Sequence, residues 1–171
     1  MTKIKISSDF LPLSSYEIVS NDDPTLETIS LTLFVAGCPR RCKNCHNESL
    51  QTVTEKNCQI VSLEKIKKLI LSKKILVKSI VFCGGDFLPF YEKQLETLVD
   101  FCKKENLKTI LYTGETYENI KEKLKNKIDI IISEPFEYSL FSQNTFPASS
   151  NQKVWINQKM IDPKILKINN F

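Results

Sequence analysis

The chain has 171 residues, of which 42% are hydrophobic and 26% charged, and its formal net charge is +4. This length is enough for one domain to bury a core without disulfide bridges, and the composition is that of an ordinary globular protein. The lysines between residues 65 and 78 alternate with aliphatic residues, as on an amphipathic helix, and no basic cluster with a stacking platform accompanies them, so we expect no nucleic-acid partner.

The N-terminus and the cysteines predict the compartment. The first ten residues, MTKIKISSDF, contain no apolar signal-peptide region, and the longest apolar stretch, around ISLTLFVAG, is too short to cross a bilayer. We therefore expect a cytoplasmic protein without membrane association, in which thiols stay reduced. The six cysteines are then expected to be ligands, catalytic thiols or core residues rather than disulfides.

Short apolar strands and helices alternate along the chain. The expected order is a strand over 28–37, a helix over 63–72, a strand over 79–83, a helix over 91–105, a strand over 108–113, a helix over 116–126, a strand over 128–133 and a last apolar run over 153–156. Continuous runs of Ile, Leu and Val between helices are typical of a parallel sheet that is buried on both faces.

These elements predict the fold class and the domain organisation. A complete eightfold βα barrel needs about 250 residues, so we predict an α/β fold that forms a partial, open βα barrel of five to six parallel strands. Residues 1–171 are expected to form a single domain, with an N-terminal segment 1–27, a core 28–157 and a C-terminal tail 158–171.

The unusual stretches of sequence follow the ends of the predicted strands. GCPRRCKNCHN (37–47) follows the first strand, GGDFLP (84–89) the second, TGET (113–116) the third and SEP (133–135) the fourth. Ligands bind at the carboxyl ends of parallel strands, so we expect these stretches to meet in one site. The SSNQ stretch (149–152) precedes its strand, and this rule does not explain it.

Cys38, Cys42 and Cys45 have the spacing Cys-x3-Cys-x2-Cys and are followed by the only histidine, His46. Thiolates are the soft ligands that iron–sulfur clusters require, and three of them leave one iron of a four-iron cluster open to an exogenous molecule. Two other readings stay open at this point. One is a structural zinc site completed by His46 or Cys58, and the other is a ferredoxin-like electron carrier, for which the first gap is too long.

The motifs resemble those of the radical S-adenosylmethionine enzymes, which carry Cys-x3-Cys-x2-Cys after the first strand and a Gly-Gly-Glu/Asp motif after the second. Within that superfamily the chain is similar to the activating proteins of anaerobic ribonucleoside-triphosphate reductases. The similarity is carried by LFVAGCPRRCKNCHN, GGDFL, YTGET and SSNQKVW, which occur in the order and at the separations of that family. One departure is Glu115, where the family commonly has an aromatic residue.

The resemblance implies one 4Fe-4S cluster and S-adenosyl-L-methionine as the cofactors. It implies that Cys38, Cys42 and Cys45 bind the cluster, whose fourth iron chelates the amino and carboxylate groups of the methionyl moiety. The residues implied to contact S-adenosylmethionine are Asn44, Cys45 and His46 beside the adenosine, Gly84 and Gly85 through close backbone approach, and Asp86 through the ammonium, with Thr113 and Ser133 as weaker candidates.

The implied activity is reductive cleavage of S-adenosylmethionine to a 5′-deoxyadenosyl radical. That radical would generate a glycyl radical on the large subunit of anaerobic ribonucleoside-triphosphate reductase, with flavodoxin or ferredoxin as electron donor. The alternatives are a small radical enzyme resembling 7-carboxy-7-deazaguanine synthase and a zinc-stabilised binding module. Of the other cysteines, Cys102 is expected in the core, Cys83 in packing beside the Gly-Gly turn and Cys58 in a loop.

Overall fold

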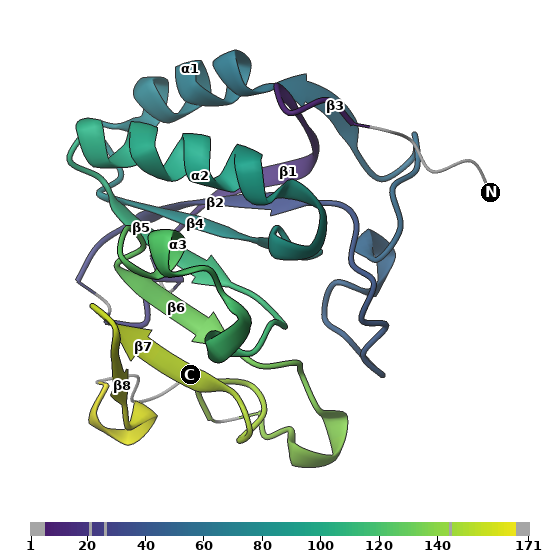
Figure 1. Cartoon of the computed structure of the whole chain (residues 1–171), viewed down its shortest axis with the longest axis vertical. Helices are drawn as coiled ribbons and strands as arrows, with labels where there is room; N and C mark the ends of the chain where they lie inside the picture. The colour runs from purple at the N-terminus through teal and green to yellow at the C-terminus, as the bar shows by residue number, and fades with distance from the viewer. Residues whose placement is uncertain (1–5, 21, 26, 144, 167–171) are drawn as a thin grey trace.

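The computed structural model describes residues 6–20, 22–25, 27–143 and 145–166. Its centre is an eight-stranded sheet with the order β3-β1-β2-β4-β5-β6-β7-β8 (Figure 1). The strands are β1 (Phe10–Val19), β2 (Ser30–Val35), β3 (Gln59–Ser62), β4 (Ser79–Gly84), β5 (Lys108–Tyr112), β6 (Ile130–Ser133), β7 (Lys153–Ile156) and β8 (Lys159–Ile161). The helices are α1 (Leu63–Lys73), α2 (Leu88–Lys104) and α3 (Glu122–Lys125), and short 3-10 turns are η1 (Glu48–Leu50), η2 (Tyr117–Asn119), η3 (Tyr138–Leu140) and η4 (Pro163–Ile165).

The predicted α/β class is confirmed, but the number of parallel strands needs correction. Strands β2, β4, β5 and β6 pair in parallel, whereas β1 and β3 on one side and β7 and β8 on the other pair antiparallel. The sheet therefore has four parallel strands rather than five or six. A parallel connection needs a crossover, usually a helix, and the chain between β6 and β7 contains only the 3-10 turn η3, so β7 returns antiparallel.

One further element differs from the sequence-based prediction, and the N-terminal segment, whose pairing the sequence left open, joins the sheet. The N-terminal segment contributes β1, which pairs with β2 and β3. The helix predicted over 116–126 is reduced to η2 and α3, because Ile120 and Lys121 between them have extended backbone angles that interrupt a helix.

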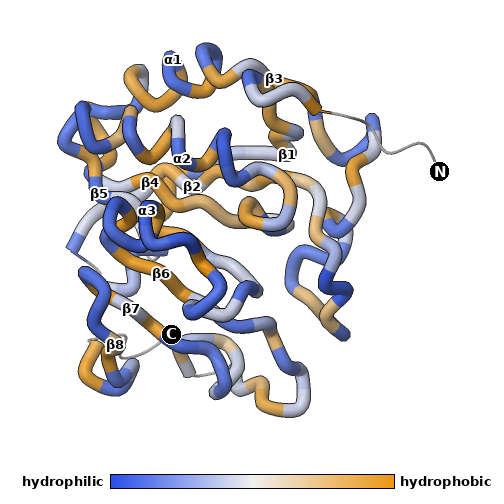
Figure 2. Tube along the Cα trace, in the orientation of Figure 1, coloured by the Kyte–Doolittle hydropathy of each residue, from blue (hydrophilic) through white to orange (hydrophobic). Residues whose placement is uncertain are grey.

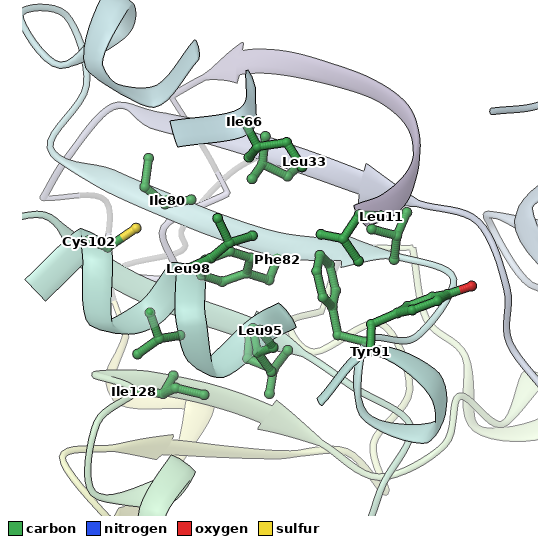
Figure 3. Packing of buried hydrophobic residues seen from close by; sticks show 14 of the residues in the cluster. Leu11, Leu33, Ile66, Ile80, Phe82, Tyr91, Leu95, Leu98, Cys102 and Ile128 are labelled. Carbon is green, nitrogen blue, oxygen red and sulfur yellow. The ribbon is translucent and has the colours of Figure 1, made fainter. Parts of the chain in front are cut away.

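The main core lies between the sheet and the helices. Helices α1 and α2 lie along the same face of the strands (Figure 1), and Figure 2 shows hydrophobic stretches along β4 and β6 and alternating hydrophobic and hydrophilic residues on α1 and α2. Leu33, Ile80 and Phe82 of the strands pack there with Leu98 of α2. Cys102 belongs to the same cluster and is fully buried, which confirms it as a core thiol (Figure 3).

The opposite face of the parallel strands carries a second, smaller hydrophobic cluster. It consists of Val81, Ile110, Ile130, Ile132 and Val154, with Cys83 and Tyr112 packed against it. Side chains alternate between the two faces of a strand, so the strands that bury one set of residues under the helices present another set to this face. Within the described part of the chain, no helix is long and apolar enough to span a membrane.

Candidate metal centre at the rim of the parallel strands

The cysteine loop begins at the carboxyl end of β2 and is anchored just before its first cysteine. The Gly37 N–H donates to the Leu50 carbonyl at 2.7 Å, and the Cys38 N–H donates to the Gln51 carbonyl at 3.0 Å. The Tyr91 hydroxyl, from a kinked turn of α2, donates to the Ala36 carbonyl at 2.9 Å. The start of the loop is therefore held both by its own far end and by α2.

The predicted ligands Cys38, Cys42 and Cys45 line one cavity of about 800 Å³. The same cavity is lined by His46, Gly84, Gly85 and Asp86, and its inner wall includes Phe34, Val81, Cys83, Tyr112 and Ile132. The stretches that follow β2 and β4 thus meet, as the strand-end rule predicts. Cys83, expected beside the Gly-Gly turn, faces this cavity.

Asn44 does not join these residues. Its side chain is exposed, its φ is 54°, and Asn47 rather than Asn44 lines the cavity. The contact with the adenosine that the resemblance implies at Asn44 would then be made by its main chain, and it stays a prediction. His46 does reach the cavity, and its ring packs edge-on against Phe136 and Phe141, with centroid distances of 5.7 and 5.8 Å.

The surroundings of Cys38 and Cys42 favour the protonated thiol when no metal is bound. Burial raises the pKa of both Cys38 and Cys42, and a charge on the neighbouring cysteine raises each further, Cys42 acting on Cys38 and Cys45 on Cys42. Because the thiolate is the metal ligand, binding of a cation at this position both requires and stabilises the deprotonated form.

The three cysteines fit a polynuclear iron–sulfur cluster, because all of them line one cavity and thiolates are the ligands that such clusters require. Among the described residues, no group of three or more His, Cys, Asp or Glu side chains is arranged to hold one metal ion. In a four-iron cluster each thiolate binds a different iron, so the sulfurs need to face one cavity rather than converge on one point. Cys58, the alternative fourth zinc ligand, lies in a separate surface hollow, where its thiol donates to the Thr54 carbonyl at 3.4 Å.

Gly84 and Gly85 allow the end of β4 to approach the backbone of Val35 and Gly37 at the start of the cysteine loop, whereas the prediction was an approach to S-adenosylmethionine. A Cβ on Gly84 would lie 2.6 Å from the Val35 carbonyl oxygen, and a Cβ on Gly85 would lie 2.4 Å from the Gly37 carbonyl oxygen. The Gly85 N–H donates to Val35 at 2.7 Å, and the Asp86 N–H donates to Gly37 at 2.9 Å. These glycines therefore bring the end of β4 against the end of β2, a role that the prediction of contact with the cosubstrate did not include.

Asp86 is the most buried carboxylate of the cavity, with 1% of its surface exposed. Its oxygens accept from the Thr113 hydroxyl at 2.8 and 3.0 Å, the Gly114 N–H at 3.0 Å, the Leu88 N–H at 3.2 Å and Arg40 Nε at 3.3 Å. Burial raises the pKa of Asp86, and these donors oppose that effect. Thr113, a weaker candidate for contact with S-adenosylmethionine, thus donates its hydroxyl hydrogen bond to Asp86.

Arg40 is a member of this site that sequence reasoning missed. It lies in the loop between Cys38 and Cys42, lines the cavity and joins Asp86 to Glu115, whose Oε2 accepts from Arg40 Nη2 at 2.8 Å. The signal in the sequence was the carboxylate at position 115, one of the departures from the family resemblance described above.

The SSNQ stretch, which strand-end logic left unexplained, supports the segment that follows β6. Ser149 is fully buried. Its hydroxyl accepts from the Glu137 N–H at 3.2 Å and donates to Gln152 Oε1 at 3.2 Å. The Asn151 amide donates to the Pro135 carbonyl at 2.8 Å. The motif thus holds the segment whose Phe136 touches His46 and lines the cavity.

Ser133, the other weaker candidate for contact with S-adenosylmethionine, binds Trp155 instead of lining the cavity. It is fully buried, and its hydroxyl accepts from the Trp155 indole N–H at 3.1 Å. It therefore connects β6 to β7 and does not line the cavity.

Comparisons with known proteins agree with this site. The family model described as a 4Fe-4S single cluster domain matches residues 27–155, which contain the cysteine loop, the Gly-Gly-Asp turn and the SSNQ stretch. The chain is 31% identical over 133 residues to the anaerobic ribonucleoside-triphosphate reductase-activating protein of Enterobacteria phage T4, an alignment that covers 74% of this chain and 83% of that protein. It is also 31% identical over 112 residues to the pyruvate formate-lyase-activating enzyme of Clostridium pasteurianum, with 61% of this chain and 44% of that enzyme covered.

Among solved structures, the crystal structure of QueE from Escherichia coli is similar in fold. The TM-score is 0.50 at 16% sequence identity, and the match covers 63% of this chain and about half, 53%, of that one. The fold and the cysteine site define a radical S-adenosylmethionine-type domain with one 4Fe-4S cluster, and the chain belongs to the glycyl-radical activase family within that class.

Proposed function

We propose that this protein cleaves S-adenosyl-L-methionine reductively and generates a glycyl radical on the large subunit of an anaerobic ribonucleoside-triphosphate reductase. The observation that carries the proposal is the meeting of Cys38, Cys42 and Cys45 with the Gly-Gly-Asp turn around one cavity. Support for this particular partner comes from the relative in phage T4, of which the alignment covers 83%.

When bound, a reduced 4Fe-4S cluster supplies the electron that splits the sulfonium into methionine and a 5′-deoxyadenosyl radical, which takes a hydrogen atom from the partner's glycine. A low-potential donor such as flavodoxin or ferredoxin supplies that electron. The residues of this chain bind and orient the reactants. Cys38, Cys42 and Cys45 would hold the cluster, and Asp86 would bind the methionyl ammonium through a charge-assisted hydrogen bond.

The apolar part of the cavity wall would limit the access of water to this chemistry. Phe34, Val81 and Ile132 are apolar, and a dry cavity protects a carbon radical from side reactions. None of these steps requires a protein base, which agrees with a site whose one histidine, His46, packs against two aromatic rings.

The test is activation of the purified reductase subunit. The protein is reconstituted anaerobically with iron and sulfide, reduced, and incubated with S-adenosylmethionine and the partner. We expect about four irons per chain, release of 5′-deoxyadenosine and a glycyl-radical EPR doublet on the partner. Cleavage of S-adenosylmethionine without that doublet would reject the partner and favour a small-molecule substrate. One zinc and no iron would reject the radical chemistry altogether.

A further inference from the structure

Asp86 has no acceptor position left for an additional donor. An ionised carboxylate offers about four lone-pair sites. In this structure Oδ1 accepts from the Leu88 N–H and the Thr113 hydroxyl, while Oδ2 accepts from the Gly114 N–H and Arg40 Nε, with a second, longer contact to Thr113. A ligand ammonium therefore reaches Asp86 only if one of these donors leaves.

The four donors differ in how freely they move. The Leu88 and Gly114 donors are backbone amides at the start of α2 and just after β5, and Thr113 is buried, with 5% of its surface exposed. Arg40 alone combines a flexible side chain, 23% exposure and the longest contact to Asp86, at 3.3 Å. It is also the only cation of the four, so replacing it with an ammonium conserves the charge beside the buried carboxylate.

Glu115 provides a second partner for the displaced guanidinium. Its Oε2 already accepts from Arg40 Nη2 at 2.8 Å, the shorter of the two ion pairs of Arg40. Gly114 leaves room for the Arg40 side chain, since a Cβ there would lie 2.4 Å from Arg40 Cδ. Oε1 of Glu115 already accepts from the Thr116 N–H and the Asn119 amide, at 3.1 and 3.2 Å. Among the described residues Oε2 accepts from Arg40 alone, so it has a second acceptor position for another N–H of the guanidinium once Arg40 leaves Asp86.

We propose that Arg40 is a positioning residue that occupies Asp86 and moves onto Glu115 when the α-ammonium of S-adenosylmethionine binds. The inference rests on the proposed use of S-adenosylmethionine and adds a step to it, the exchange of one cation for another on Asp86. Glu115 sets how readily Arg40 leaves, so the two residues affect the affinity for the ligand in opposite directions.

The experiment measures equilibrium binding of S-adenosylmethionine to the anaerobically reconstituted protein and its variants. Arg40→Met removes the competitor for Asp86 and should tighten binding about three- to tenfold, whereas Glu115→Gln removes the alternative partner and should weaken it by a similar factor. In the double variant, Glu115→Gln should have no further effect. The probe 5′-methylthioadenosine lacks the amino-acid moiety, so its affinity should not change in any of these variants.

The outcomes distinguish a failure of the Arg40 proposal from a failure of the proposed function. Weaker binding of S-adenosylmethionine by Arg40→Met at full iron content would overturn it, because Arg40 would then bind the ligand itself. An equal effect of the variants on 5′-methylthioadenosine would overturn it as well, since a general loosening of the loop would explain both. Failure of the wild-type protein to bind S-adenosylmethionine would reject the proposed function together with the inference. The Glu115→Gln variant keeps the test decisive if Arg40→Met fails to take up iron.

Discussion

Replacement of Gly85 by alanine tests whether the Gly-Gly turn holds β4 against the cysteine loop. The added Cβ would lie 2.4 Å from the Gly37 carbonyl oxygen and 2.8 Å from its carbonyl carbon, and both are backbone atoms. Gly85 has no φ in the left-handed region, so alanine can adopt its backbone conformation. The substitution therefore changes the distance between two backbones and little else.

The expected cost follows from these contacts. Forcing an extra carbon into a packed position costs about 1–3 kcal/mol. The Asp86 N–H to Gly37 hydrogen bond, 2.9 Å long, would be lost as the two segments move apart, at a cost of about 1 kcal/mol. The free energy of unfolding should fall by about 2–4 kcal/mol, which for a protein of this size lowers Tm by about 4–16 °C.

Gly114→Ala is the matched control. Its Cβ would also lie 2.4 Å from a neighbouring atom, but that atom is Cδ of the Arg40 side chain, which can rotate away. We expect a loss of less than about 1 kcal/mol there. The measurement is urea or thermal unfolding of the protein without added iron, followed by iron uptake. A Gly85→Ala protein within about 0.5 kcal/mol of wild type, or two variants that are equally destabilised, would refute the reasoning.

Three further substitutions test the cluster ligands, the support of the segment after β6 and the pH dependence of stability. Cys42→Ala should abolish cleavage of S-adenosylmethionine and lower bound iron while leaving a folded protein, and unchanged cleavage would contradict the ligand assignment. Ser149→Ala breaks hydrogen bonds of a fully buried hydroxyl and should lower the free energy of unfolding in urea by about 1–3 kcal/mol. Ser150→Ala, at the exposed neighbouring serine, should lower it by less than about 0.5 kcal/mol. Equal losses would contradict the role of Ser149 in supporting the segment after β6. Burial raises the pKa of Asp23, but hydrogen bonds from Thr25, Thr28 and Lys108 outweigh it and lower that pKa below its ordinary value. Ionised Asp23 therefore stabilises the fold above the unfolded-state pKa of about 4, and this contribution is lost as the pH falls through the folded-state value. Asp23→Asn should then lose less stability than wild type between about pH 5 and 2, and a parallel decline in the two proteins would contradict the assignment.

The cysteine loop and the Gly-Gly-Asp turn were predictable because their residue types carry their chemistry. Thiolates at this spacing bind iron–sulfur clusters, and both stretches follow strands whose carboxyl ends meet. The direction of β7 was not predictable, since an apolar run such as KVWI fits a parallel or an antiparallel strand equally well. The connection that precedes it decides between the two, and here it contains no crossover helix.

The network around Asp86 could not be read from the sequence for a different physical reason. Arg40 lies 46 residues from Asp86 and 75 from Glu115 along the chain. An arginine between two cysteines looks like an ordinary surface residue, and its role arises only when the ends of β2, β4 and β5 are brought together. The same holds for the SSNQ stretch, whose side chains bind backbone groups of residues 135–137 that no pattern in the sequence connects to it.

The distribution of glycine explains how these strand ends approach so closely. The 171-residue chain has four glycines, and all of them, Gly37, Gly84, Gly85 and Gly114, lie at the ends of β2, β4 and β5. A Cβ at any of the four would lie 2.4 to 2.6 Å from a neighbouring residue. Other left-handed turns of the chain use residues with side chains, such as Asn106 and Asn157, where asparagine tolerates the conformation at low cost. All four glycines thus lie where a side chain would not fit, and two of them, Gly37 and Gly84, also have φ values of 108° and 106° that favour glycine. This is the reason to expect alanine at Gly85 to disturb the cysteine loop before it disturbs the rest of the sheet.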